Sequence, residues 1–141
     1  MLCYRGVAHS GREYLNILKQ VELWTAEDGR ARFRETDIPL DQGTPASLLS
    51  ERLPASGIQF RRSPVGFTSA FHCTPTPQWV FVLAGTMEIG LQDGSVRRFA
   101  PGEHFLSADT LPEGVVFDPA VHGHCSAQVG DEPLETLFIR P

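Results

Sequence analysis

The chain has 141 residues, of which 17 are acidic and 12 are basic, so its formal net charge is -5. A chain of this length supports one ordinary domain with its own hydrophobic core, and it leaves no room for a second full domain. Acidic residues occur along the whole chain and no basic face can follow a phosphate backbone. We therefore expect no nucleic-acid partner.

The sequence shows no sign of a membrane or of an oxidising compartment. No apolar run approaches the roughly 20 residues of a membrane span, and residues 1–20 lack the apolar stretch of a signal peptide. The three cysteines, Cys3, Cys73 and Cys125, are odd in number and form no closely spaced pair, which favours reduced thiols. We expect a cytoplasmic protein without membrane association.

Residues 1–20 are predicted to form an N-terminal arm. Within it, the apolar residues of Gly11–Gln20 are spaced for one face of a short helix. From Val21 onward the pattern changes to short strands, the first at Val21–Trp24 and the second at Ala31–Thr36, both expected at sheet edges. Residues 21–141 are predicted to form a single domain.

A connection rich in proline, glycine and serine follows at Pro39–Ser56. Ala46–Arg52 is expected to form a short helical turn that Pro54 ends. The 13 glycines and 11 prolines divide the rest of the chain into brief apolar segments. We predict strands at Ile58–Arg62, Gly66–Cys73, Gln78–Ala84, Thr86–Leu91, Ser95–Phe99, His104–Ala108, Gly114–Asp118, His122–Val129 and Leu134–Arg140.

Close and regular strand spacing favours a sandwich or barrel over an α/β arrangement. Gly85 and Gly94 each end a dipeptide typical of tight hairpin turns, in which glycine supplies the positive φ. Along Gln78–Ala84 both alternating faces are apolar, so both are expected to be covered, the outer one by more chain or by a second subunit. The sequence thus predicts an all-β fold, a single antiparallel β-barrel with a short N-terminal arm.

A polar group is expected on the inner face of this barrel. His72 and Thr74 share one face of a predicted strand, and Gln78 begins the next, so the alternation places the three side chains near one another. Cys73 and Cys125 each follow a histidine placed inside, so they are expected to point outward and to serve ordinary packing. One arginine of each pair, Arg61-Arg62 and Arg97-Arg98, should also face inward.

The spacing of these residues resembles the first motif of the cupin superfamily. That motif consists of a glycine, two histidines separated by one residue, a glutamate and a second glycine; Gly66, His72, Thr74, Gln78 and Gly85 stand at the corresponding positions. The second cupin motif ends in a histidine, for which His124 is our choice. The resemblance covers residues 58–141, and it implies a jelly-roll-like double-stranded β-helix that commonly forms homodimers.

In cupins the motif histidines and glutamate hold one divalent metal ion, often iron, manganese, nickel or zinc. Transferred residue by residue, His72 and His124 are retained, whereas Thr74 replaces a histidine and Gln78 replaces the carboxylate. Gln78 or His122 is a weaker candidate for a third ligand. A neutral amide attracts such a metal ion less than a carboxylate does.

Three functions follow from this pattern. We prefer a small-molecule-binding protein with no assured catalytic metal, in which His72, Thr74, Gln78 and His124 line a polar pocket. The alternative is a metal-dependent cupin enzyme of the dioxygenase or isomerase type, which would use His72 and His124. The third is a dimeric interaction module that works through outer apolar strand faces.

Overall fold

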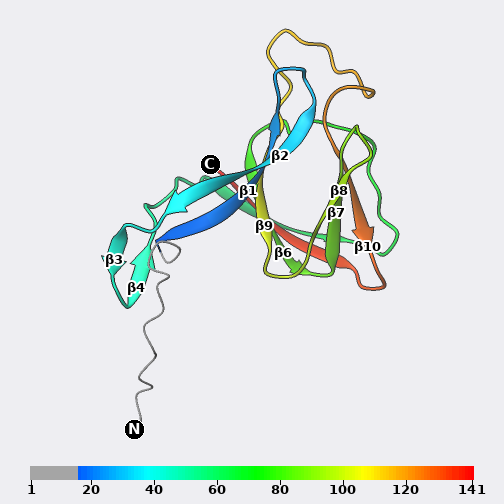
Figure 1. Ribbon diagram of the computed structural model, residues 1–141. Helices are drawn as coiled ribbons and strands as arrows, with labels where there is room; N and C mark the ends of the chain where they lie inside the picture. Colours follow the sequence, from blue (N-terminus) through cyan, green and yellow to red (C-terminus); the bar gives the residue numbers. More distant parts are fainter. Residues whose placement is uncertain (1–15) are drawn as a thin grey trace. The chain divides into compact units, whose positions relative to one another are not determined.

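The computed structural model describes residues 16–141, and within this range the chain is all-β (Figure 1). The range contains no helix long and apolar enough to cross a membrane. Its strands are β1 (Ile17–Thr25), β2 (Ala31–Pro39), β3 (Gln42–Thr44), β4 (Ser47–Leu49), β5 (Gly57–Ser63), β6 (Gln78–Ala84), β7 (Thr86–Gly90), β8 (Val96–Phe99), β9 (His104–Ala108), β10 (Cys125–Val129) and β11 (Leu134–Arg140).

The described residues divide into two compact units, one of residues 16–19 and 37–52 and the other of residues 20–36 and 53–141. In the first unit, β3 and β4 form an antiparallel hairpin that pairs Gln42 with Leu49. The helical turn predicted at Ala46–Arg52 is therefore wrong. A segment this short cannot repay the cost of nucleating a helix, whereas pairing with β3 satisfies its backbone groups.

The short helix predicted at Gly11–Gln20 is also wrong where the structure describes it, because Ile17–Gln20 belongs to β1. Residues 11–15 lie outside the described residues. Strand β1 is hydrogen-bonded to neighbouring strands of the sheet, so tertiary pairing overrides the local helical spacing. Strand β1 lies between β2 and β9, so of the two predicted edge strands only β2 stands at an edge.

All strands except β3 and β4 form two sheets with a jelly-roll-like arrangement. This arrangement confirms the predicted fold class. A six-stranded sheet has the order β2-β1-β9-β6-β11-β5, and a three-stranded sheet has the order β10-β7-β8. The sheets are not joined into one closed barrel. The β1–β9 pair is parallel, contrary to a purely antiparallel barrel, and the long intervening chain permits this direction.

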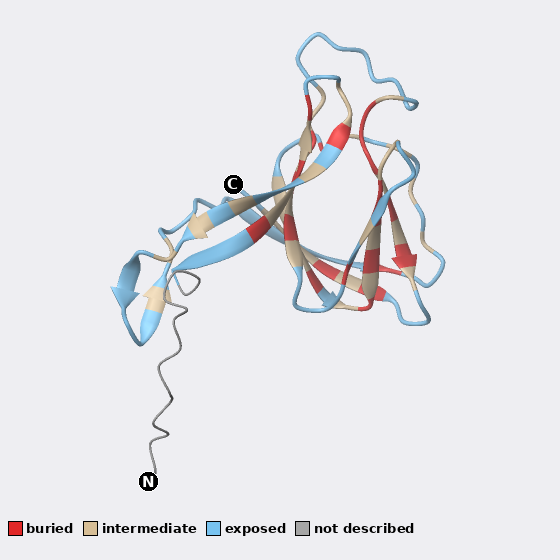
Figure 2. Cartoon of the chain, viewed as in Figure 1, coloured by how far each residue is buried: buried red, intermediate tan, exposed pale blue. Residues whose placement is uncertain are grey.

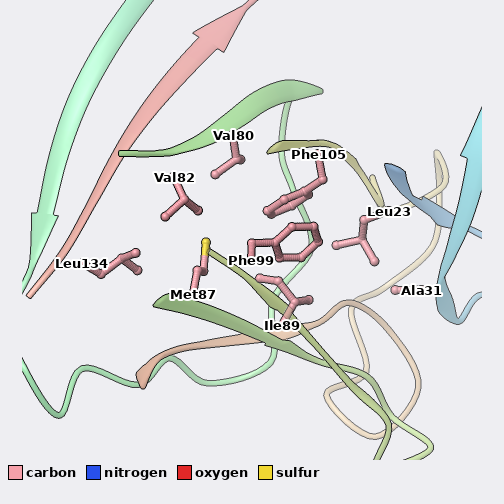
Figure 3. Packing of buried hydrophobic residues seen from close by; sticks show 9 residues of the cluster. All are labelled: Leu23, Ala31, Val80, Val82, Met87, Ile89, Phe99, Phe105 and Leu134. Carbon is pink, nitrogen blue, oxygen red and sulfur yellow. The ribbon is translucent and has the colours of Figure 1, made fainter. Parts of the chain in front are cut away.

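The hydrophobic core lies between these two sheets, and Figure 3 shows its side chains meeting from both. Phe99 of β8 and Phe105 of β9 stack at its centre, with ring centroids 4.4 Å apart. Buried and partly buried positions alternate along β9 and β10 (Figure 2), so one face of each strand is covered. The buried cluster comprises Leu23, Ala31, Val80, Val82, Met87, Ile89, Phe99, Phe105 and Leu134.

Strands β6, β9 and β11 have the predicted bounds, but two predicted strands are loops. Gly66–Cys73 makes isolated bridges at Thr68 and His72 and no continuous ladder, and Gly66 has φ +88°, outside the strand region. Gly114–Asp118 is likewise irregular. The prolines on either side of that segment, Pro112 and Pro119, lack the N–H groups that a ladder needs.

The outer face of the six-stranded sheet carries exposed apolar side chains. Ile58 and Phe60 of β5 are 65% and 69% exposed, and Leu83 of β6 is 47% exposed. The predicted homodimer would cover such a face, and it stays a prediction.

His104 on the same face makes the stability of the protein depend on pH. Its ring stacks on that of Phe81, with centroids 5.0 Å apart, and the residue is half-buried. Burial lowers the pKa of His104 below its usual value of about 6.5. Between the folded and unfolded pKa values the unfolded chain therefore binds more protons, so stability is lost as the pH falls through this window.

We expect His104→Gln to reduce this loss, because glutamine does not titrate. The measurement is the urea midpoint of unfolding at about pH 7.5 and about pH 5, compared between wild type and variant. The midpoint should fall less in the variant than in the wild type. An equal fall in both proteins would show that His104 makes no contribution.

Candidate binding site

A cavity of about 200 Å³ opens beside the core and brings together the four residues predicted to bind a ligand. His72, Thr74, Gln78 and His124 all line it. Thr74 and His124 are buried, whereas His72 is exposed at the rim, so the cavity is open to solvent rather than closed. Their role in binding stays a prediction.

Inward-facing side chains of β5 and β11 form the remaining walls of the cavity. The inward positions of β5 place Gln59 and Arg61 at the cavity, and those of β11 place Phe138 and Arg140 there. Buried apolar side chains from β6, β7 and β9 form the base. These are Val80, Met87 and Phe105.

A backbone bridge joins the loop that carries His72 to the residues that precede β10. The N–H of His72 donates to the carbonyl of His124 and the N–H of His124 to that of His72, each at 2.9 Å. The two rings lie with centroids 4.6 Å apart. Gly123 permits this approach, because it has φ +77° and a Cβ there would overlap the backbone of His72.

A buried carboxylate fixes the orientation of His124. Asp109 has no exposed surface, and its Oδ2 accepts a hydrogen bond from Nδ1 of His124 at 2.5 Å. The Oδ1 of Asp109 accepts from the hydroxyl of Thr74 at 2.7 Å. The Thr74 hydroxyl has a single proton, so it accepts in turn from the hydroxyl of Ser107 at 2.6 Å. Through these hydrogen bonds Thr74 holds the carboxylate of Asp109 in position.

These bonds assign the tautomers of both cavity histidines. A carboxylate and a carbonyl only accept hydrogen bonds, so Nδ1 of His124 carries a proton toward Asp109. In the same way Nδ1 of His72 donates to the carbonyl of Ala70 at 2.8 Å. In each neutral imidazole Nε2 is then left with a lone pair that can accept a hydrogen bond from a ligand.

His122 does not line this cavity, so it cannot serve there as the third metal ligand that the sequence suggested. The ring of His122 lies near Phe117, with centroids 6.1 Å apart, and its Nδ1 accepts from the backbone N–H of Asp118 at 2.9 Å. The positive φ of Gly123 turns the chain between His122 and His124, so the two side chains do not share a strand face.

The cavity residues do not fit a tightly held divalent metal ion. His72 and His124 are its only imidazoles, and the amide of Gln78 supplies no charge. Within residues 16–141, no group of three or more histidine, cysteine and acidic side chains is arranged to hold a metal ion. The carboxylate of Asp109 already binds His124 and Thr74. Iron, manganese, nickel and zinc prefer imidazole, thiolate and carboxylate ligands to neutral amides and hydroxyls.

Cys73 points away from this cavity, as the alternation predicts. It does not line the cavity but a neighbouring hollow, which shares His72 and Thr74 with the cavity and also includes Leu111 and Phe117. Burial, and then the negative charge of Asp109, raise the pKa of the Cys73 thiol. The thiol is therefore mostly protonated at neutral pH and is a poor nucleophile.

Only one of the two arginine pairs contributes to the cavity. Arg61 lines it, while Arg62 on the opposite face of β5 forms an ion pair with Glu135. In the second pair, Arg98 forms an ion pair with Glu88 and Arg97 lies over the ring of Phe33. Arg97 also shares the inward face of β8 with the buried Phe99, over whose ring it lies. One arginine of each pair thus faces inward, but only Arg61 lines the cavity.

Sequence reasoning missed Asp109, because this residue lies outside every predicted strand and motif. A signal was nevertheless present. Phe105, Ser107 and Asp109 stand at alternate positions, and all three are buried. Continuing the period of two past the end of β9 would have placed this carboxylate on the inner face.

Comparisons with known proteins find similarity among solved structures. No protein-family model matches the sequence, and no curated protein matches it. Among the matching structures is a conserved protein of unknown function from Streptococcus pyogenes, 21% identical, with a TM-score of 0.40 over 67% of this chain and 70% of that one.

Two further solved structures are similar to this chain. The DMSP lyase DddQ from Ruegeria pomeroyi is 18% identical, with a TM-score of 0.39 over 100% of this chain and 55% of that one, so the chain spans about half of its length. The Cnp3 cupin domain of Schizosaccharomyces pombe is 11% identical, with a TM-score of 0.40 over 89% of this chain and 85% of that one. The strand order of the present chain is jelly-roll-like.

Proposed function

We propose that the protein binds a small polar organic molecule in this cavity and needs no resident metal ion to do so. The observation that carries the proposal is the fixed imidazole of His124. Its Nδ1 is bound to the fully buried Asp109, so its Nε2 is an oriented acceptor. Packing alone would not require a buried carboxylate to orient this ring.

The other polar groups of the cavity are also held in place. Nε2 of His72 is a second acceptor at the rim, and Nε of Arg140 donates to Oε1 of Gln78 at 3.2 Å. The amide nitrogen of Gln78 then remains as a donor. A ligand with both hydroxyl and carbonyl groups would satisfy these acceptors and this donor together.

The size of the cavity limits the ligand. Pockets for drug-sized molecules measure roughly 300–1,000 Å³. The volume here is about 200 Å³, so the ligand is smaller than a drug-sized molecule. We therefore propose a metabolite-sized ligand with an apolar body and a few polar atoms.

Native mass spectrometry and elemental analysis of untagged protein test this proposal together. We expect a small organic adduct in the wild type, its loss in His124→Ala, and a metal content far below one equivalent. His104→Ala is the matched control, since it removes a histidine from the outer sheet face and should keep the adduct.

The rival function is a metal-dependent enzyme that uses His72 and His124. Purified protein with close to one equivalent of iron, manganese, nickel or zinc, lost on His72→Ala, would establish the rival and overturn our proposal. Growth with all four metals added gives that rival its best chance.

A further inference from the structure

We infer that the ligand of this cavity is a small organic acid whose carboxylate binds between Arg61 and Arg140. This inference rests on the proposed binding function and names the chemical class of the ligand. It follows from the distribution of charge and of apolar surface around the cavity.

The cavity is locally cationic although the chain as a whole is acidic. Arg61 and Arg140 both line it, and no aspartate or glutamate does. Within the described residues neither arginine forms an ion pair. By contrast, Arg62, next to Arg61 and on the opposite face, is paired with Glu135. Two arginines without acidic partners at one opening create a positive potential that attracts an anion.

The carboxylate of Asp109 lies behind the polar wall of the cavity. Asp109 is fully buried, and both of its oxygens accept hydrogen bonds, from His124 and Thr74. Its charge is thus separated from the opening by the side chains that it binds. The two arginines lie at the exposed rim, where an anionic head group would enter.

Each arginine keeps donors for a carboxylate. The guanidinium of Arg61 lies over the ring of Phe67, 4.7 Å from its centroid, a contact that leaves the N–H edges of the group available. Arg140 uses Nε toward Gln78, which leaves its terminal nitrogens. Guanidinium groups bind carboxylates through two parallel hydrogen bonds, a geometry that a lysine does not provide.

The inner walls define the rest of the ligand. Val80, Met87, Phe105 and Phe138 supply apolar surface to the same cavity, and so does His124, whose Nε2 keeps a lone pair that can accept a hydrogen bond. A short branched acid would place its carboxylate at the rim and its apolar body inside. A hydroxyl group on that body would donate to His124.

Amide signals in NMR titrations with four probes test the inference. The probes are isovalerate, its neutral isostere isovaleramide, the cation isoamylamine and inorganic phosphate. We expect isovalerate to shift the signals of cavity residues most strongly and to bind about tenfold or more tighter than the amide, because charge-assisted hydrogen bonds exceed neutral ones by this amount.

Variants of the arginines show which residues bind the carboxylate of isovalerate. Arg61→Gln and Arg140→Gln should each weaken isovalerate binding about tenfold, whereas Arg62→Gln, which changes the same charge on the opposite face, should not. Thermal melting of each variant checks that the fold is intact. Equal binding of isovalerate by all three variants would overturn the inference.

The four probes also separate this inference from the proposed function. If the amide or the amine binds as well as the acid and His124→Ala abolishes that binding, the cavity binds small molecules but the anion assignment is wrong. If phosphate binds as tightly as isovalerate, the apolar body makes no contribution and the organic-acid class is wrong. If no probe shifts any cavity signal, the inference fails, and the search for a native adduct still tests the proposed function.

Discussion

Replacing Gly123 by alanine is expected to lower the stability of the protein by about 2 kcal/mol or more. Gly123 has φ +77°, and a Cβ there would overlap the backbone of His72. The strain of a left-handed backbone and the loss of the paired hydrogen bonds between His72 and His124 act together. At this chain length the melting temperature should fall by about 5 °C or more.

Gly94→Ala is the matched control for this experiment. Gly94 has φ +84°, close to that of Gly123, but no atom lies within 4 Å of a Cβ built on it. The fall in melting temperature of Gly94→Ala therefore measures the backbone strain alone. The additional fall in Gly123→Ala measures the overlap with the backbone of His72. Equal melting temperatures for the two variants would contradict the close approach of the two chain segments.

The strands were predictable where a single face is buried. The buried residues alternate, Val80 and Val82 along β6 and Phe105 and Ser107 along β9, and the predicted bounds match the structure. The pattern could not distinguish a strand from an extended loop at Gly66–Cys73, because such a loop also presents alternate residues to the core. The parallel β1–β9 pairing was equally hidden, since no local pattern records which distant strand becomes the neighbour.

The candidate site was predictable in part for the same physical reason. Motif spacing and alternation named His72, Thr74, Gln78 and His124, and all four line one cavity. The partner that orients His124 comes from another strand end, and only the fold brings it within hydrogen-bond distance. Sequence spacing therefore identifies the residues of the wall, whereas hydrogen bonds between distant segments determine their chemistry.

Removing the carboxylate of Asp109 should have the largest effect on the site itself. Asp109→Ala leaves Nδ1–H of His124 and the hydroxyl of Thr74 without their acceptor in a buried place. Unsatisfied buried donors cost about 1–3 kcal/mol each, so we expect a loss of about 2–5 kcal/mol in the free energy of unfolding. Urea denaturation measures this loss, and Asp131→Asn, at an exposed turn, should cost far less.

Asp109→Asn separates the orientation of His124 from the stability of the fold. Asparagine has nearly the same shape and keeps one acceptor oxygen, but its NH₂ group can donate to Nδ1 of His124 and so move the imidazole proton to Nε2. The nitrogen chemical shifts of His124 report that change of tautomer directly. We expect Nε2–H in the variant, together with weaker binding of any ligand that donates to Nε2, while the melting temperature falls less than in Asp109→Ala. An unchanged tautomer with unchanged binding would mean that Asp109 stabilises the core without setting the chemistry of the cavity.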